Sequence, residues 1–164
     1  MAVIKEHENI KAFLDMIAYA EGTINYGNED GYNVLFGGET FNNGYVDHPR
    51  KAITRRMGNS SITSSAAGKY QFLTRTWDAI VKQYGFKGRF THEAQDLAAI
   101  KLIQERKAYD DIKNGDFAKA VGKVRNIWAS LPGAGYGQPE KKLEELEKVY
   151  KEAGGWLRGE KPSM

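Results

Sequence analysis

The sequence predicts a single α+β domain, mostly helical, with a small β-hairpin lobe and a cleft between the two parts. Apolar residues recur with helical spacing near the N-terminus and through the second half of the 164-residue chain. The stretch 23–50 is instead dense in Gly, Asn and aromatic residues, which is typical of short strands joined by turns. No repeat and no flexible linker divides residues 1–164, and two lobes of one domain usually leave a cleft between them.

Five helices are expected, each with recognisable signals at its ends. In chain order they lie between Ile10 and Gly22, from Tyr70 to Tyr84, after the cap Thr91 as far as Ile103, from Asp116 to Trp128, and from Pro139 to Gly154–Gly155. Within the small lobe, Tyr32 to Phe36 is expected to form one of the strands.

The composition excludes several classes of function. The chain has no cysteine, so disulfide scaffolds, Cys-ligated zinc and thiol catalysis are ruled out. His7, His48 and His92 are scattered, and we expect neither a metal nor an organic cofactor. No apolar run approaches the roughly 18 residues of a membrane span, and the charged start does not resemble a signal peptide. We therefore expect synthesis in the cytoplasm and no membrane insertion.

The net charge of +3 arises from 24 basic and 21 acidic residues, a mild excess that suits attraction to a polyanion such as a cell wall or nucleic acid. Arg50, Lys51, Arg55 and Arg56 form the densest basic cluster. We interpret this cluster as a solvated face, because the aromatic or recognition-helix support that nucleic-acid binding needs is not found there.

Glu21 is the most informative residue of the chain. It lies eleven residues after Ile10, about 20° round the helix, near the centre of the apolar stripe. It also falls in the last turn, where the helix dipole disfavours a carboxylate. Burial and the dipole both raise the pKa, and a carboxyl group protonated near neutral pH can act as a general acid. The alternative is that the helix frays there and Glu21 reaches solvent.

A conventional glycosidase needs a second carboxylate. Glu29, Asp30, Glu39 and Asp47 are candidates, but flanking turn residues explain each of them as a loop polar group or cap. No partner for Glu21 is thus marked out by the pattern.

Two other segments are compatible with a polysaccharide cleft. Gln71, which follows Gly68 and Tyr70, could hydrogen-bond a sugar substituent or simply cap the backbone. Tyr136 lies in the Gly-rich loop 128–137 and could stack on a sugar ring.

The chain resembles the lambda-type phage endolysins, which are lytic transglycosylases of the lysozyme superfamily. The resemblance covers nearly the whole chain, and its most specific blocks are Glu21-Gly22-Thr23, Gly37-Gly38-Glu39, Asp47-His48-Pro49-Arg50-Lys51, Tyr70-Gln71, and Asn126 to Gln138. It departs from the family pattern between Thr54 and Ser65, and Asn33 stands where an Asp is expected.

This resemblance implies a lysozyme-like fold and cleavage of the β-1,4 bond between N-acetylmuramic acid and N-acetylglucosamine in peptidoglycan. Glu21 matches the single catalytic acid, which would generate 1,6-anhydromuramoyl products without a second carboxylate. Tyr70, Gln71 and Tyr136 carry over as substrate-contacting residues. The family further implies a monomer that accumulates in the host cytoplasm and reaches the wall in the periplasm when a separate holin opens the membrane.

Three alternatives remain open at this stage. A hydrolytic lysozyme would use Glu21 with a second carboxylate such as Asp30, although Phe36 stands where a water-positioning Thr is expected. A sugar-binding protein without catalysis would retain only the cleft. A nucleic-acid binder would show salt-dependent binding to DNA.

Overall fold

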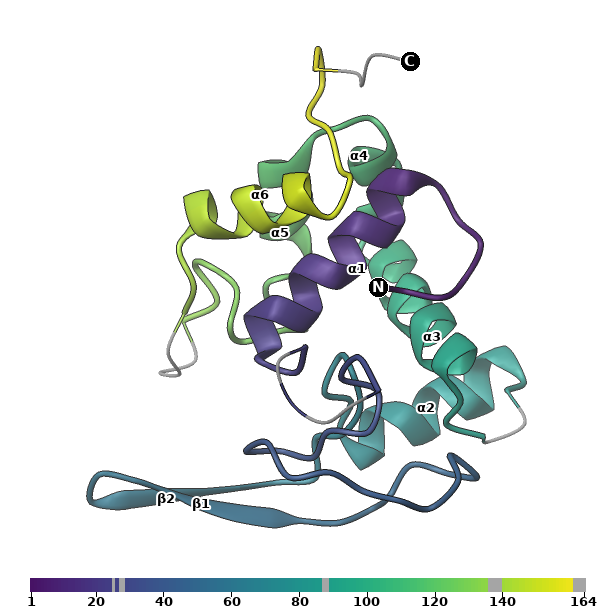
Figure 1. Ribbon diagram of the computed structural model, residues 1–164, viewed down its shortest axis with the longest axis vertical. Coiled ribbons are helices and arrows are strands. Elements are labelled where there is room, and N and C mark those ends of the chain that lie inside the picture. Colours follow the sequence, from purple (N-terminus) through teal and green to yellow (C-terminus); the bar gives the residue numbers. More distant parts are fainter. Residues whose placement is uncertain (25, 27–28, 87–88, 136–139, 161–164) are drawn as a thin grey trace.

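The computed structural model describes residues 1–24, 26, 29–86, 89–135 and 140–160. Within them the chain forms six helices and one two-stranded sheet (Figure 1). The elements are α1 (Glu8–Glu21), β1 (Ile53–Met57), β2 (Ser60–Ser64), α2 (Thr74–Tyr84), α3 (His92–Glu105), α4 (Tyr109–Lys113), α5 (Phe117–Val124) and α6 (Leu143–Glu152). The predicted α+β class is confirmed.

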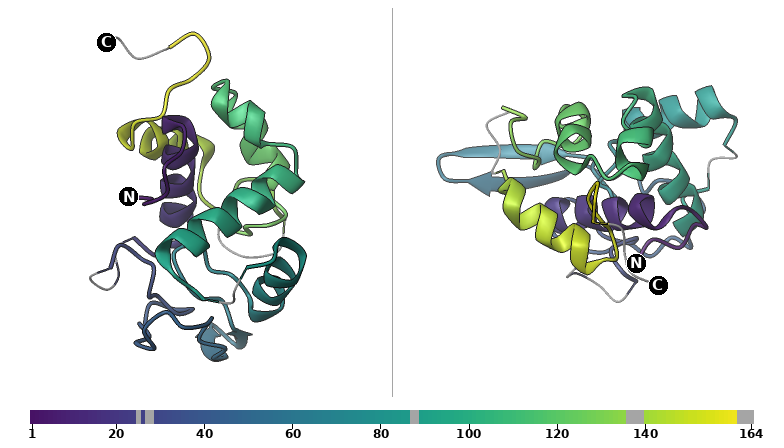
Figure 2. Two further views of the ribbon diagram at one scale, coloured as in Figure 1. Left: turned by 90° about the vertical axis from the view of Figure 1, so that its right-hand side faces the viewer. Right: turned by 90° about the horizontal axis from the view of Figure 1, so that it is seen from above.

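Helix α1 is the centre of the helical lobe. It packs against α6 and α4, and its apolar residues from Ile10 to Ala18 are almost completely buried. Figure 1 shows α3, α4, α5 and α6 on the same side of the molecule as α1, while α2 lies near the loops and the hairpin, and Figure 2 gives two further views of this arrangement. The C-terminal end of α1 points toward the hairpin (Figure 1), so this helix carries its last residue to the junction of the two lobes.

The helix ends largely follow the predicted signals. Gly22 closes α1 in the left-handed conformation with φ 78°, and Gly85 closes α2 with φ 69°. Thr91 caps α3, since its side chain accepts a hydrogen bond from the Ala94 amide. Asp116 precedes α5 as predicted, but its carboxylate binds Arg158 instead of capping the helix.

The strands lie later in the chain than predicted. Residues 32–36 make only isolated bridges, Val34 with Thr40 and Leu35 with Ala67, because the turns around them leave no run of extended backbone. The sheet is instead the antiparallel pair β1–β2, which is closed by a two-residue turn at Gly58-Asn59. Gly58 has φ 66°, the conformation that such tight hairpin turns require.

Three helix boundaries also differ from the prediction. Helix α2 begins at Thr74, because Phe72 is held in a bridge with Ala67. Helix α5 ends at Val124, and the short helix α4 was not predicted. Helix α6 begins at Leu143, while Pro139 lies outside the described residues.

A buried carboxylate joins distant segments beneath the small lobe. Asp96 of α3 accepts hydrogen bonds from the hydroxyls of Tyr32 at 2.8 Å and Tyr70 at 2.6 Å. It also accepts from the backbone amides of Val3 at 2.8 Å and Ile4 at 3.1 Å. These four donors compensate the carboxylate for its lost hydration and fix the segment around Tyr70 against the helical lobe.

None of the helices formed by the described residues has the length and apolar character needed to cross a membrane.

Candidate active site

Glu21 is held in place by the turn that ends α1. The amide of Gly22 donates back to the carbonyls of Ala18 and Tyr19, which closes the helix. The next residue, Thr23, is buried and donates its hydroxyl to the carbonyl of Lys69 at 2.7 Å. The Glu21 carboxyl group is therefore attached to a rigid helix end that is tied to the segment leading into Gln71.

The surroundings of Glu21 favour its protonated form. Burial raises its pKa from the ordinary 4.5 to about 7, although the side chain retains some exposure. The Ser130 hydroxyl donates a hydrogen bond to Oε2, which acts in the opposite direction by stabilising the carboxylate. The predicted rise in pKa is thus confirmed, and its main cause is desolvation. With a pKa near neutrality, the group can both give and take a proton.

Two adjoining cavities open beside Glu21 and share Gly37 and Gln71. The first, of about 300 Å³, is lined by Ala20, Glu21, Phe36, Gly37, Ile62, Ser64, Ala66, Gln71, Leu73, Ile127, Ala129 and Ser130. The second, of about 240 Å³, is lined by Glu21, Gly22, Thr23, Tyr26, Val34, Leu35, Gly37, Gly38, Arg55 and Gln71. Together they form the predicted cleft, bounded by the end of α1, the hairpin and the loop after α5.

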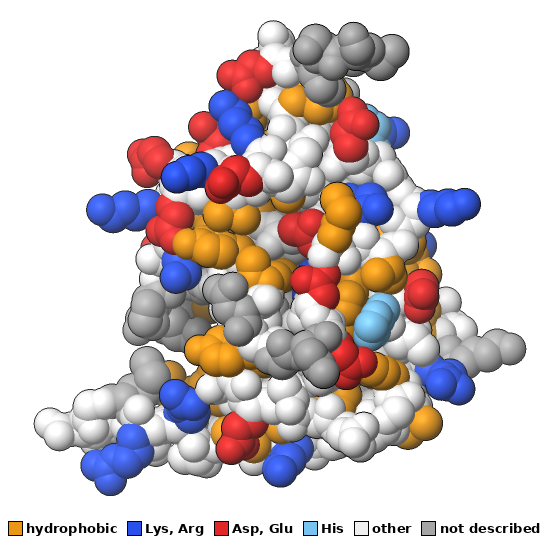
Figure 3. Space-filling view, in the orientation of Figure 1, with side chains coloured by type: hydrophobic (Ala, Val, Ile, Leu, Met, Phe, Trp, Pro, Cys, Tyr) orange, Lys and Arg blue, Asp and Glu red, His pale blue; other side chains and the backbone are white. Residues whose placement is uncertain are grey.

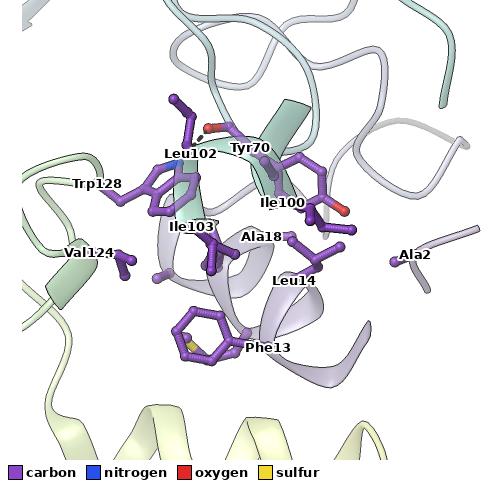
Figure 4. Packing of buried hydrophobic residues seen from close by; sticks show 14 of the residues in the cluster. Ala2, Phe13, Leu14, Ala18, Tyr70, Ile100, Leu102, Ile103, Val124 and Trp128 are labelled. Carbon is purple, nitrogen blue, oxygen red and sulfur yellow. Dashed lines mark hydrogen bonds between the residues drawn. The ribbon is translucent and has the colours of Figure 1, made fainter. Parts of the chain in front are cut away.

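Tyr70 does not reach this cleft through its side chain. Its ring has no exposed surface, and its hydroxyl donates to Asp96. Its carbonyl accepts a hydrogen bond from the buried indole of Trp128 at 3.0 Å (Figure 4). Direct substrate contact by the Tyr70 side chain is therefore not supported, because the ring is packed in the core. Tyr70 instead ties the loop that carries Ser130 to the Asp96 cluster.

Gln71 does line both cavities, as expected of a substrate-contacting residue. Its backbone adopts φ 55°, and its side-chain amide donates to the carbonyls of Gly68 at 2.9 Å and Val34 at 3.2 Å. The capping interpretation therefore holds for the amide nitrogen, while sugar contact by Gln71 stays a prediction. Tyr136, the third predicted contact, lies outside the described residues.

Three of the four other candidate carboxylates have partners elsewhere, and the fourth, Glu39, is exposed and lines neither cavity. Asp30 accepts from the buried Lys69 ammonium at 2.9 Å. Glu29 accepts from Asn33 at 2.9 Å, and Asp47 pairs with Arg50 at 2.6 Å. Among the described residues that line the two cavities, Glu21 is the only Asp or Glu. The described part of the cleft is thus built around one carboxyl group.

The sequence did not predict a place in the cleft for three of its residues, and Arg55 was expected only as part of a solvated basic face. Ser130 lies within the block 126–138, but only its contact with Glu21 gives it a role. Tyr26 and Arg55 line the second cavity from segments far apart in the chain. No local pattern indicates such residues, because a long-range contact leaves no periodicity in the sequence.

Another pocket, of about 290 Å³, is almost entirely apolar and lies between Ile4, Phe86 and Leu97. Its only carboxylate, Glu93, is exposed to solvent. Over the described parts of the chain, no three His, Asp or Glu side chains come together as metal ligands. The cleft at Glu21 combines a cavity with a carboxyl group whose pKa lies near neutrality, which suits it to acid–base chemistry.

A helical lobe and a hairpin lobe, with one acid of raised pKa among the described residues of the cleft between them, are typical of a glycosidase of the lysozyme type. The family model Endolysin matches residues 11–157, and the chain belongs to the endolysin family. The chain is 49% identical to the endolysin of Escherichia phage lambda, over 90% of this chain and 92% of that protein. It is 46% identical to the endolysin of Escherichia phage P2, over 94% and 98%.

The fold is likewise similar to solved structures of the lambda protein. Bacteriophage lambda lysozyme complexed with a chitohexasaccharide superposes with a TM-score of 0.88 at 45% identity, covering 95% of this chain and all of that one. A second structure of lysozyme from bacteriophage lambda gives a TM-score of 0.83 at 44% identity, with the same coverage. The expected lysozyme-like fold is confirmed.

Proposed function

We propose that this chain is a phage endolysin that cleaves the β-1,4 bond between N-acetylmuramic acid and N-acetylglucosamine of peptidoglycan by lytic transglycosylation. The observation that carries the proposal is the single carboxyl group of the described cleft, Glu21, with its pKa of about 7. Family membership and the chitohexasaccharide bound by the lambda lysozyme support a β-1,4-linked amino-sugar polymer as substrate.

The chemistry needs only this one group. Protonated Glu21 donates its proton to the glycosidic oxygen, and the bond from that oxygen to C1 of the muramoyl residue breaks. The resulting Glu21 carboxylate then takes the proton of the muramoyl C6 hydroxyl as the C6 oxygen bonds to C1. The products are a free hydroxyl on one strand and a 1,6-anhydromuramoyl end on the other. Glu21 regains its proton, and no water is consumed.

A hydrolytic lysozyme would require a carboxylate positioned to act with Glu21. Asp30, the residue first considered for that role, is held by Lys69 and does not line either cavity. This arrangement favours transglycosylation over hydrolysis.

The masses of the products test the proposal. Purified Gram-negative peptidoglycan is digested, and the released muropeptides are weighed by mass spectrometry. Anhydromuramoyl products, lighter by one water and without a reducing muramic end, are expected. Reducing products would overturn transglycosylation while leaving a glycosidase. Unchanged release by Glu21→Gln would overturn the assignment of the acid.

We infer from family membership that the enzyme acts as a monomer on the cell wall after a separate holin opens the host membrane. Expression of the chain alone should leave Gram-negative cells intact, and co-expression with a holin should lyse them. Lysis without holin would contradict this route.

A further inference from the structure

Two glycines form the floor of the second cavity. Gly37 and Gly38 have φ of 91° and 107°, a conformation that favours glycine, and a side chain at either position would press on a neighbouring side chain. A Cβ at Gly37 would lie 2.7 Å from Nη1 of Arg55, and one at Gly38 would lie 3.0 Å from the ring of Tyr26. The guanidinium group and the ring therefore pack directly on the glycine backbone, and both belong to the cavity that contains Glu21.

The register of the hairpin aims Arg55 at this cavity. Residues directly opposite each other in an antiparallel pair project from the same face of the sheet. Arg55 pairs with Ile62 and Ile53 pairs with Ser64, and both Ile62 and Ser64 line the first cavity. Arg56 projects from the opposite face and lines neither cavity. Arg55 and Arg56 are neighbours in the chain, but their side chains project from opposite faces of the sheet.

The charge of Arg55 is not neutralised by the described part of the chain. Its Nη1 donates to the carbonyl of Gly37 at 2.7 Å, and none of the ion pairs among the described residues includes it. By contrast, Arg50 contacts the carboxylates of Asp47 and Asp78, each at 2.6 Å. Basic side chains are visible over the hairpin in Figure 3, and the basic residues of the hairpin are Arg55 and Arg56. Arg55 therefore presents a cation, with donors to spare, at the edge of the cleft.

We propose that Arg55 binds a carboxylate of the peptide stem that the muramoyl residue carries, and so favours stem-bearing glycan over unsubstituted glycan. The proposal rests on the proposed function, since it concerns the same cleft. The N-acetylated sugar rings and their glycosidic bonds are neutral, so the anionic groups of the polymer belong to its stems. A guanidinium fork matches a carboxylate in geometry and charge.

The test compares two substrates and two matched variants. One substrate is glycan strands with uncrosslinked stems. The other is the same strands after an amidase has removed the stems and the lactyl carboxylates that this hydrolysis frees have been converted to neutral amides. The ratio of the two initial rates is measured for the unaltered enzyme, Arg55→Gln and Arg56→Gln. Arg55→Gln should lower the preference for stem-bearing strands about 10-fold, as loss of one charge-assisted contact predicts. Arg56→Gln should leave both rates and their ratio unchanged.

Two further arms strengthen the test. Arg55→Lys, which keeps the charge but loses the fork, should give an intermediate ratio. Amidation of the stem carboxylates should lower the rate of the unaltered enzyme to about that of Arg55→Gln. Equal effects of Arg55→Gln on both substrates, or no effect on either, would overturn the inference while the proposed function stands. If the unaltered enzyme released no anhydromuramoyl product from either substrate, the proposed function itself would fail.

Discussion

Asp96 and Glu21 are both carboxyl groups withdrawn from solvent, and they differ most in the number of hydrogen bonds they receive. Asp96 is completely buried and accepts from two tyrosine hydroxyls and two backbone amides. Glu21 retains some exposure, yet among the described residues only Ser130 donates to it. The more deeply buried group is thus the better compensated one.

The difference shows how one fold assigns two roles to the same functional group. Four donors stabilise a buried carboxylate and make it a joint between segments. A carboxyl group that is desolvated and has one donor holds its proton near neutrality. The pKa of about 7 of Glu21 follows mainly from desolvation, which the hydrogen bond from Ser130 offsets only in part. Hydrogen-bond satisfaction, more than burial alone, separates the structural acid from the reactive one.

The largest expected difference between Glu21 and Asp96 is in catalytic activity. Glu21→Gln should lower the rate of muropeptide release about 1,000-fold, because the amide cannot donate the proton that the glycosidic oxygen needs. Asp96→Asn should retain the rate per folded molecule to within about threefold, because Asp96 does not line the cavities. Both are measured on the same peptidoglycan. Glu39→Gln, which alters an exposed acid of the small lobe, is the matched control.

For stability the order is reversed, and the substitution at Asp96 should have the large effect. Asp96→Asn is expected to lower the free energy of unfolding by about 3 kcal/mol, since it removes the charge that four buried donors face. Urea denaturation at pH 7 measures the loss. Asp78→Asn, at an exposed ion pair with Arg50, should leave the free energy of unfolding almost unchanged, because solvent screens such a pair. Equal losses for the two variants would show that the Asp96 cluster is not a joint of the fold.

The raised pKa of Glu21 also predicts how stability depends on pH. Between its ordinary 4.5 and about 7, the folded chain keeps a proton that the unfolded chain has released. Stability should therefore fall as the pH rises through this window. Glu21→Gln removes the cost of ionising a desolvated carboxyl group in the folded chain. After allowance for partial exposure, the free energy of unfolding of this variant at pH 8 should exceed that of the unaltered protein by about 2 kcal/mol. Near pH 4 the two proteins should agree, and a constant difference at all pH values would contradict the account.

The smallest expected effect concerns the one donor to Glu21. Ser130→Ala removes a hydrogen bond that favours the carboxylate, so the pKa of Glu21 should rise further. The pH at which activity falls by half on the alkaline side should move up by about 0.5 unit. Ser64→Ala, at another residue of the same cavity, should leave that pH unmoved. A downward shift would show that Ser130 does not act by stabilising the charge.

The sequence indicated Glu21 because the signal is local. An acid in the apolar stripe at a helix end is visible from spacing alone, and the structure confirms both its position and its raised pKa. The prediction of the strands is wrong in position, because the Gly and Asn residues between 23 and 50 form turns without a ladder, whereas the ladder forms around Gly58-Asn59. Tyr70 was expected in the cleft, but its neighbour Gln71 lines it.

The sequence by itself determined the helical character, the small second lobe and the candidate acid, because periodicity and turn chemistry act over a few residues. Only the tertiary structure decided which groups surround that acid. Ser130 and Glu21 are 109 positions apart in the chain, and Lys69 and Asp30, which form a charged hydrogen bond, are 39 positions apart. Desolvation and hydrogen-bond partners depend on such distant contacts, and they set the proton affinity on which the proposed chemistry rests.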